Sequence, residues 1–391
     1  MTIVNFLFYS ICALLSLGQI GRFSFSGQQI NGYLYEVPLF VLTVLLVMIY
    51  KSEPILSIRE KLPSLLFFIG YLLFTFIVTT FFYSVQTNTI AMLYLLRLIL
   101  YFTFFSYFYY YIQKQLTNRV LNTGLVICCS ATIVFSLIQY YLYPNLRNIS
   151  YLGWDPHWYR MVGTFLDPPI TGAVYGLLFI SLLSYRYFFG AVRYVVLGAL
   201  LLFLFLTYSR GSFAAFSITI LTMFMQKKWL LGAAVCAAVF IGIVYLLPHP
   251  FGESVNLLRT FSIYSRLENY TEAAKDWSKS PVFGVGYNRI RYTRDKSTFS
   301  DQKDLQNNHA GASYHSSFLI IIVTGGVVGL LLFIWLLVSI AQFSPTALWS
   351  TVFLSLLSLT DNVLLHPFVL ILYLIIVAGS RVKISPSHTQ S

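Results

Sequence analysis

Long apolar segments recur along most of this chain. A transmembrane α-helix needs about 20 mostly apolar residues to cross the hydrocarbon core of a bilayer. Twelve runs reach or approach this length, which predicts an all-α membrane protein with about twelve transmembrane helices. Their approximate cores are residues 3–19, 35–50, 63–83, 90–112, 120–143, 169–188, 193–208, 211–225, 229–247, 315–340, 347–360 and 366–380. The short pair 193–208 and 211–225 fits a tilted hairpin as an alternative to two full spans.

The composition agrees with a protein that has almost no soluble part. Of the 391 residues, 58% are hydrophobic and 10% are charged, whereas soluble proteins carry about 25% charged residues. Residues 3–19 lack the basic start and the small-residue cleavage site of a signal peptide, so we expect them to remain as a first helix. We expect one membrane domain over residues 1–391.

Basic residues predict which loops face the cytoplasm. If the N-terminus is cytoplasmic, the inside loops hold eleven Lys and Arg residues, whereas the short outside loops hold four, namely Arg22, Arg147, Arg160 and Arg210. This asymmetry follows the positive-inside rule. It predicts two cytoplasmic termini and two sizeable extracytoplasmic loops, residues 144–168 and 248–314. The net charge of +12 therefore largely reflects topology, and we expect no nucleic-acid partner.

Several common sites are absent from the sequence. The four cysteines, Cys12, Cys128, Cys129 and Cys236, lie inside apolar runs, so neither a disulfide framework nor a zinc site is expected. There is no phosphate-binding GxxxxGK[ST] loop and no Asp-x-Asp pair for a metal and a nucleotide sugar. We therefore expect no metal and no cofactor.

Three arginines and a histidine lie in the polar breaks on the predicted outside face. They are Arg160, Arg210, Arg266 and His315. Arginine holds phosphate in a bidentate manner, and neutral histidine accepts a proton near pH 7. Together they indicate a site that binds an anionic group, with a lipid-linked phosphate as the obvious ligand. Each also has a plainer explanation: arginines at an interface bind headgroups or loop acids, and a histidine at a helix start bonds backbone.

The large loop contains one predicted helix, from about Ser262 to Lys279. Leu267, Tyr270, Ala274 and Trp277 repeat every three or four residues and predict an apolar face. Pro281 and the GVGYN that follows end the helix in a turn. Asp361 and His366 flank the last predicted outside turn and are second-rank site candidates.

Four segments, in order and with matching spacing, resemble the O-antigen ligase and O-antigen polymerase superfamily of bacterial surface-polysaccharide assembly. They are YRMVGTF followed by DPP, the SRG turn at 209–211, the stretch RLENYTEAAKDWSKSPVFGVGYN, and His315-Ser316 followed by nine residues and then Gly326 and Gly329. The resemblance covers roughly residues 150–330. The family more often has Asn after the histidine, where this chain has Ser316.

The resemblance implies a GT-C-type fold and metal-independent transfer of a glycan from an undecaprenyl-diphosphate carrier to a sugar hydroxyl. It implies catalytic roles for His315, Arg210 and Arg266, and diphosphate binding by Arg160, Arg210 and Arg266. The partners would be the carrier-linked oligosaccharide, a glycan or lipid A-core acceptor, and membrane lipids. The enzyme would lie in the bacterial inner membrane with its active site facing the periplasm or cell exterior.

Ligation to lipid A-core and polymerisation of repeat units are nearly even alternatives. The other functional class is a transporter or flippase of a lipid-linked glycan. That class predicts ionisable residues at mid-membrane and a repeat relating two halves. Only Arg97 is charged deep within an apolar run, and no internal repeat is visible.

Overall fold

The computed structural model describes residues 3–25, 29–114, 118–152, 157–185, 187–226, 242, 261–293 and 313–379. Eleven of the twelve expected apolar runs contain an α-helix in this part of the chain. Of the remaining run, 229–247, only residue 242 is described, and parts of the two expected outside loops also lie outside the described residues. The helices are α1 (Ile3–Leu15), α2 (Glu36–Tyr50), α3 (Glu53–Lys61), α4 (Pro63–Thr79), α5 (Val85–Lys114), α6 (Arg119–Leu142), α7 (Pro168–Tyr185), α8 (Gly190–Leu206), α9 (Arg210–Gln226), α11 (Phe261–Ser278), α12 (Ile290–Thr293), α14 (Ser317–Ala341), α15 (Pro345–Ser358) and α16 (Pro367–Gly379).

Five of these helices are long and apolar enough to cross a bilayer by themselves: α4 with its 3₁₀ extension, α5, α6, α7 and α14. A sixth span is possible if α2 and α3 are counted as one broken span, although they bend by 96°. Four other apolar helices, α1, α8, α15 and α16, have 13 to 17 residues. The many apolar helices confirm a polytopic membrane protein, while the number twelve and the GT-C fold remain predictions.

Proline marks the first residue of four helices: α4, α7, α15 and α16. Proline suits this position because its fixed φ is helical and its missing N–H would have no partner in the first turn. The start of α15 is also capped, because the Oγ of Ser344 accepts from the N–H of Ala347 at 3.1 Å. Local sequence therefore explains where these helices begin.

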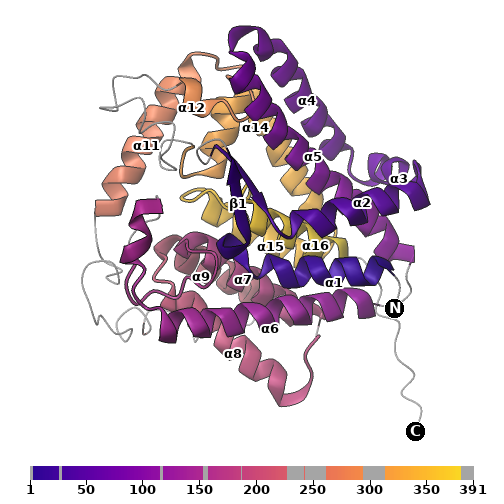
Figure 1. The fold of residues 1–391 in the computed structure, drawn as a ribbon, viewed down its shortest axis with the longest axis vertical. Coiled ribbons are helices and arrows are strands. Elements are labelled where there is room, and N and C mark those ends of the chain that lie inside the picture. Colours follow the sequence, from indigo (N-terminus) through magenta and orange to yellow (C-terminus); the bar gives the residue numbers. More distant parts are fainter. Residues whose placement is uncertain are drawn as a thin grey trace.

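One antiparallel hairpin corrects the all-α expectation. Strand β1 (Arg22–Phe25) pairs with β2 (Ile30–Tyr33), with Arg22 opposite Tyr33. The hairpin crosses in front of the C-terminal helices in Figure 1. The ring of Tyr33 lies 4.5 Å from that of Phe368, so β2 packs against the start of α16. The strands of this hairpin are short and contain no long apolar run. The hydropathy pattern that predicted the helices therefore did not predict the strands.

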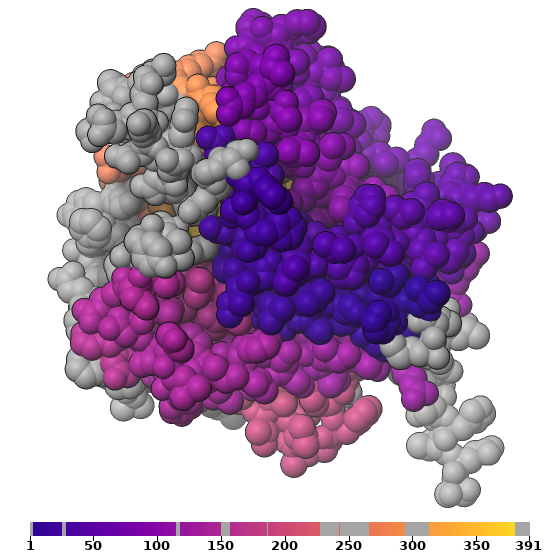
Figure 2. Space-filling model, viewed as in Figure 1, coloured from indigo at the N-terminus to yellow at the C-terminus, as the bar shows by residue number. Residues whose placement is uncertain are grey.

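Helix α16 forms the centre of the fold. It packs against α5, α7 and α15, and every residue from Phe368 to Gly379 is buried. A helix surrounded on all sides needs no polar face, which explains why α16 is apolar around its whole circumference. Figure 2 shows the N-terminal segments covering the front of this core, with α6 and α8 below them.

The start of α1 and the helix α11 lie at opposite ends of the molecule (Figure 1). Helix α11 stands beside α14 and above α9 in this view, and α3 lies on the far side with the start of α1. The candidate residue Arg266 belongs to α11 and therefore lies at this end of the molecule.

Candidate active site

The turn between α15 and α16 joins three segments that carry the candidate residues. Nη2 of Arg266 in α11 donates to Oδ1 and Oδ2 of Asp361 at 3.0 and 3.2 Å. The Arg266 side chain is 26% exposed and that of Asp361 is 9% exposed. This ion pair fixes α11 to the turn, and Asp361 is held further by the hydroxyl of Thr360 at 2.7 Å.

Helix α9 begins at the same turn. A Cβ placed on Gly211 would lie 2.7 Å from Oδ2 of Asp361 and 2.7 Å from Oγ1 of Thr360. Only glycine allows this approach, so Gly211 brings the first turn of α9, with Arg210 as its first residue, against Asp361. The Oγ of Ser209 caps α9 by accepting from the N–H of Ser212 at 3.3 Å. The SRG motif thus places an arginine and a helix N-terminus beside the Arg266–Asp361 pair.

His315 lies at the start of α14 with its side chain exposed. Its backbone N–H donates to Oδ1 of Asn269 at 3.3 Å, and Asn269 lies one turn after Arg266 on α11. The next residue, Ser316, caps α14 by accepting from the N–H of Leu319, and its hydroxyl donates to the carbonyl of Ser358 at 2.7 Å. The serine that replaces the more usual asparagine therefore ties the His315 segment to the turn after α15.

These contacts place Arg210, Arg266 and His315 around the turn that contains Asp361. Arg210, Arg266 and the N-termini of α9 and α14 together form an environment suited to an anion. The N–H groups and the dipole at the start of a helix favour negative charge. The Arg266–Asp361 bonds use one of the three guanidinium nitrogens. Among the described residues, Nε and Nη1 of Arg266 have no hydrogen-bond partner and can bind a ligand.

Arg160 has a different environment from the other arginines. It is 4% exposed, and it donates through Nε to the carbonyl of Thr207 at 2.9 Å and through Nη2 to that of Tyr208 at 2.6 Å. These carbonyls follow the last turn of α8, where cations are favoured. Arg160 therefore holds the turn that carries Arg210, and direct binding of diphosphate by Arg160 stays a prediction.

The two second-rank residues are separated. Asp361 joins the arginines, whereas His366 lines a cavity on the other side of the turn, next to Arg97. Burial and, to a smaller extent, the charge of Arg97 together lower the pKa of His366 to about 3. His366 is therefore neutral at pH 7.

The predicted apolar face of α11 is not the face that packs against α14. The helix itself spans Phe261–Ser278, close to its expected bounds, but Leu267 and Tyr270 are 62% and 41% exposed. The face directed to α14 instead carries Ala273 and Asp276, which are buried. Hydrophobic periodicity did not identify the packed face because polar contacts hold it in place. The hydroxyl of Tyr314 donates to Asp276, and Arg266 donates to Asp361.

The GVGYN segment after α11 and the Gly326–Gly329 motif of α14, the two glycine motifs, are in contact. Helix α14 is broken at Gly326, whose φ of 62° and ψ of −167° are not helical. The segment after α11 lies against this break, with the N–H groups of Val285 and Gly286 donating to the carbonyls of Val323 and Thr324, each at 2.9 Å. The N–H of Val327 donates back to the carbonyl of Pro281 at 2.9 Å. This backbone joint fixes the position of α11, and with it Arg266, relative to His315.

Sequence reasoning missed Asn269, Thr360 and Asn362. Asn269 had a detectable signal, because residues three apart lie on one helix face and Arg266 was already a candidate. Thr360 and Asn362 only gain a role through contacts across the fold, such as the bond from Ser317 Oγ to Asn362 Oδ1 at 3.0 Å. Within the described residues, no group of three or more His, Cys, Asp and Glu side chains is arranged to hold a metal ion.

One family comparison covers part of the region that contains the candidate residues. Residues 195–334 match the family model described as O-antigen ligase. No curated protein matches the chain. The matched region includes Arg210, Arg266 and His315, while Arg160 and Asp361 lie outside it. The match supports the resemblance to the O-antigen ligase and polymerase superfamily, and three of the four motifs lie inside the matched residues.

Proposed function

We propose that this protein is an extracytoplasmic glycosyltransferase that moves a glycan from an undecaprenyl-diphosphate carrier to a sugar hydroxyl. The observation that supports this most is the meeting of Arg210, Arg266 and His315, which come from three separate motifs, around one turn. Members of the matched family are glycosyltransferase-like ligases and polymerases. Ligation to lipid A-core and polymerisation of repeat units remain nearly even alternatives within this proposal.

The arginines act on the leaving group. The acceptor oxygen forms a bond to C1 of the donor sugar as the bond from C1 to the phosphate oxygen breaks, and the carrier diphosphate leaves with the electron pair. Negative charge then grows on the diphosphate, and preorganised cations stabilise this transition state. Arg266 and Arg210 provide that charge without a metal ion, and Asp361 holds the guanidinium of Arg266 in place through Nη2.

His315 acts on the acceptor. The hydroxyl must lose a proton as its oxygen attacks C1, and the imidazole accepts it as a general base. The side chain is exposed at the surface of the fold, where an incoming glycan can reach it. The contact of its backbone with Asn269 keeps it one helical turn from Arg266. The residue proposed to bind the donor diphosphate, Arg266, and the proposed base, His315, are thereby held close together.

The membrane setting supports the same proposal. The carrier is a lipid, so its diphosphate lies at the bilayer surface, where helices such as α9 and α14 begin. We place the protein in the bacterial inner membrane, with cytoplasmic termini and with the site facing the periplasm or cell exterior. The positive-inside asymmetry of the loops supports this orientation.

Purified protein in lipid nanodiscs tests the proposal. An undecaprenyl-diphosphate-linked oligosaccharide is supplied with either lipid A-core or a second carrier-linked oligosaccharide, in the presence of EDTA. We expect a longer glycan with one of these acceptors, and the productive acceptor distinguishes ligase from polymerase. Transfer that stops with EDTA and returns with magnesium contradicts the arginine-based mechanism.

Movement of the labelled donor across a vesicle membrane, with no new glycosidic bond, would instead support the transporter alternative. The control is the Arg266→Ala variant, which we expect to be folded and inactive in transfer.

A further inference from the structure

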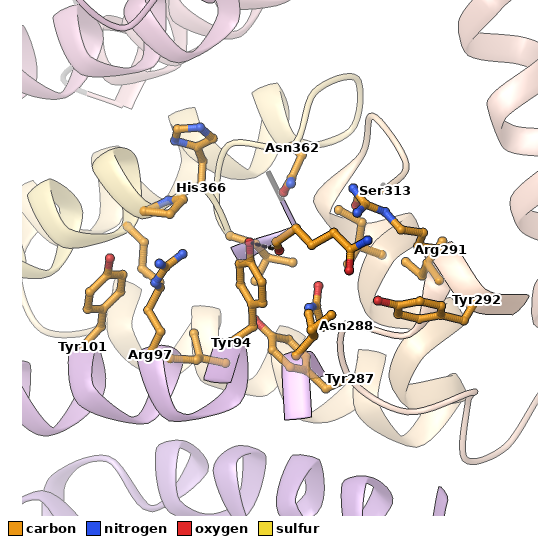
Figure 3. A pocket seen from close by; sticks show the side chains of 18 residues that line it. Tyr94, Arg97, Tyr101, Tyr287, Asn288, Arg291, Tyr292, Ser313, Asn362 and His366 are labelled. Carbon is orange, nitrogen blue, oxygen red and sulfur yellow. Dashed lines mark hydrogen bonds between the residues drawn. The ribbon is translucent and has the colours of Figure 1, made fainter. Parts of the chain in front are cut away.

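A cavity of about 210 Å³ lies on the other side of the turn from the Arg266–Asp361 pair. Figure 3 shows its side chains converging from α5, from the segment around α12 and from the turn before α16. The residues that matter here are Tyr94, Tyr287, Asn288, Tyr292, Ser313 and His366. The volume is on the scale of a single sugar ring.

The cavity combines aromatic rings with hydroxyl and amide groups that are open to a ligand. The hydroxyls of Tyr287, Tyr292 and Ser313, and the side-chain amide of Asn288, make no hydrogen bond with any described residue. Nδ1 of His366 is shielded from solvent and is also without a partner in the part of the chain that the structure describes. A buried polar atom is normally bonded, so the unmet Nδ1 of His366, in a cavity lined by accessible hydroxyl and amide groups, indicates a polar ligand.

The charges in the cavity do not favour a diphosphate. Arg97 lines the cavity, but its Nε lies 2.9 Å from Oε1 of Glu36, which compensates its charge. Arg291 also lines the cavity. Hydroxyl and amide groups, rather than a cluster of cations, make up most of the polar lining. A hydroxyl-rich ring can bond these groups, and its C–H faces can pack on the tyrosine rings.

The cavity adjoins the candidate active site through two short segments. Asn362 lines the cavity, and its neighbour Asp361 binds Arg266. Ser313 lines the cavity two residues before His315. The bond between Ser317 Oγ and Asn362 Oδ1, at 3.0 Å, ties these segments together. The cavity and the candidate active site therefore share the segment around residues 313–317 and the turn that holds Asp361 and Asn362.

We propose that this tyrosine-lined cavity binds a sugar ring of the acceptor glycan and holds its hydroxyl toward His315. The proposal rests on the proposed transferase function and assigns the acceptor subsite to it. Tyr292 and Tyr287 supply packing and hydroxyl contacts, and Asn288 and Ser313 supply the remaining hydrogen bonds.

Sugar binding without donor tests this subsite independently of catalysis. Lipid-free oligosaccharides released from the surface polysaccharide of the producing cells are added to the full-length protein in nanodiscs, and binding is measured by saturation-transfer NMR. Tyr292→Ala removes a ring, and Asn288→Gly removes an amide while suiting the positive φ of 57° at this position. Tyr143→Ala, at a tyrosine that is 62% exposed and outside the cavity, is the matched control.

We expect Tyr292→Ala and Asn288→Gly each to weaken binding about tenfold, while Tyr143→Ala binds as the wild type. In transfer assays, the same two variants should raise the KM for acceptor and leave that for donor unchanged. No binding to the wild type overturns the proposal, as does displacement of the sugar by inorganic pyrophosphate. Cavity-dependent binding without any transfer activity would refute the transferase function and leave the sugar site standing.

Discussion

Arg266 in α11 donates through Nη2 to both carboxylate oxygens of Asp361, which lies 95 residues later in the turn before α16. This pair joins the large loop to the helix bundle next to the first turn of α9. Because Asp361 occupies only Nη2, it orients the guanidinium and leaves the other two nitrogens for a ligand.

The planar shape of the arginines is the first testable feature. Arg210→Lys and Arg266→Lys keep the charge and lose the fork that binds two oxygens at once. We expect each to lower the transfer rate roughly 10²-fold, the effect of losing one transition-state donor, with Arg→Ala worse. Asp361→Asn should lower the rate and leave the protein folded. Full activity of both Lys variants would exclude bidentate binding of the diphosphate.

His315 should dominate the proton transfer. A general base contributes roughly 10²–10⁴-fold to a rate, so His315→Ala should abolish detectable transfer at unchanged levels of folded protein. His315→Gln retains hydrogen bonding and cannot take up the proton, so it should be equally inactive. Near-normal rates with Gln would make His315 a positioning group, and normal rates with Ala would remove it from the site.

The joint between the two glycine motifs should control stability. A Cβ on Gly326 would lie 2.1 Å from the carbonyl oxygen of Val282, and its φ of 62° disfavours other residues. Gly326→Ala should therefore destabilise the protein by about 1–3 kcal/mol, measured by thermal unfolding in detergent. Gly325→Ala is the matched control, since its nearest contact would be an ordinary 3.6 Å from Tyr71. Equal stability of the two variants would contradict a stabilising role for the backbone contacts at Gly326.

His366 predicts a dependence of stability on pH. Its pKa is lowered to about 3 by burial and by Arg97, whereas an unfolded histidine has a pKa of about 6.5. Between these values the unfolded chain binds one more proton than the folded one. The stabilisation is therefore complete above pH 6.5 and falls as the pH decreases toward 3.

His366→Gln removes this proton uptake, so its melting temperature should decline less than that of the wild type between pH 7.5 and about 4.5. His315→Gln serves as the control, because the His315 side chain is exposed. Parallel declines in wild type and His366→Gln would show that His366 is not buried in its neutral form.

Topology can be checked with two exposed positions. In a background without native cysteines, Ala274→Cys in α11 should react with an impermeant maleimide once the outer membrane is permeable. Glu60→Cys in α3, at the opposite end of the fold (Figure 1), should react only after the inner membrane is lysed. The reverse pattern would place the candidate site in the cytoplasm.

The sequence alone determined the helical class, most helix positions and the identity of the candidate residues. Apolar runs report local burial, so hydropathy located eleven helices among the described residues and the prolines marked several starts. The motifs named Arg210, Arg266 and His315 because their chemistry and spacing are visible along the chain. Hydropathy overlooked the hairpin of β1 and β2, and the periodicity of α11 did not reveal that Ala273 and Asp276 are buried.

Only the tertiary structure decided which candidates meet. Asp361 joins Arg266 across 95 residues, and Arg160 is diverted to the carbonyls that end α8. Such pairings depend on how helices pack, and local periodicity carries no information about a partner so distant in sequence. The same packing leaves α16 buried on every side and forms the tyrosine-lined cavity between α5, α12 and the turn before α16. Long-range contacts, which form only when the whole bundle assembles, therefore determine the shape of the site.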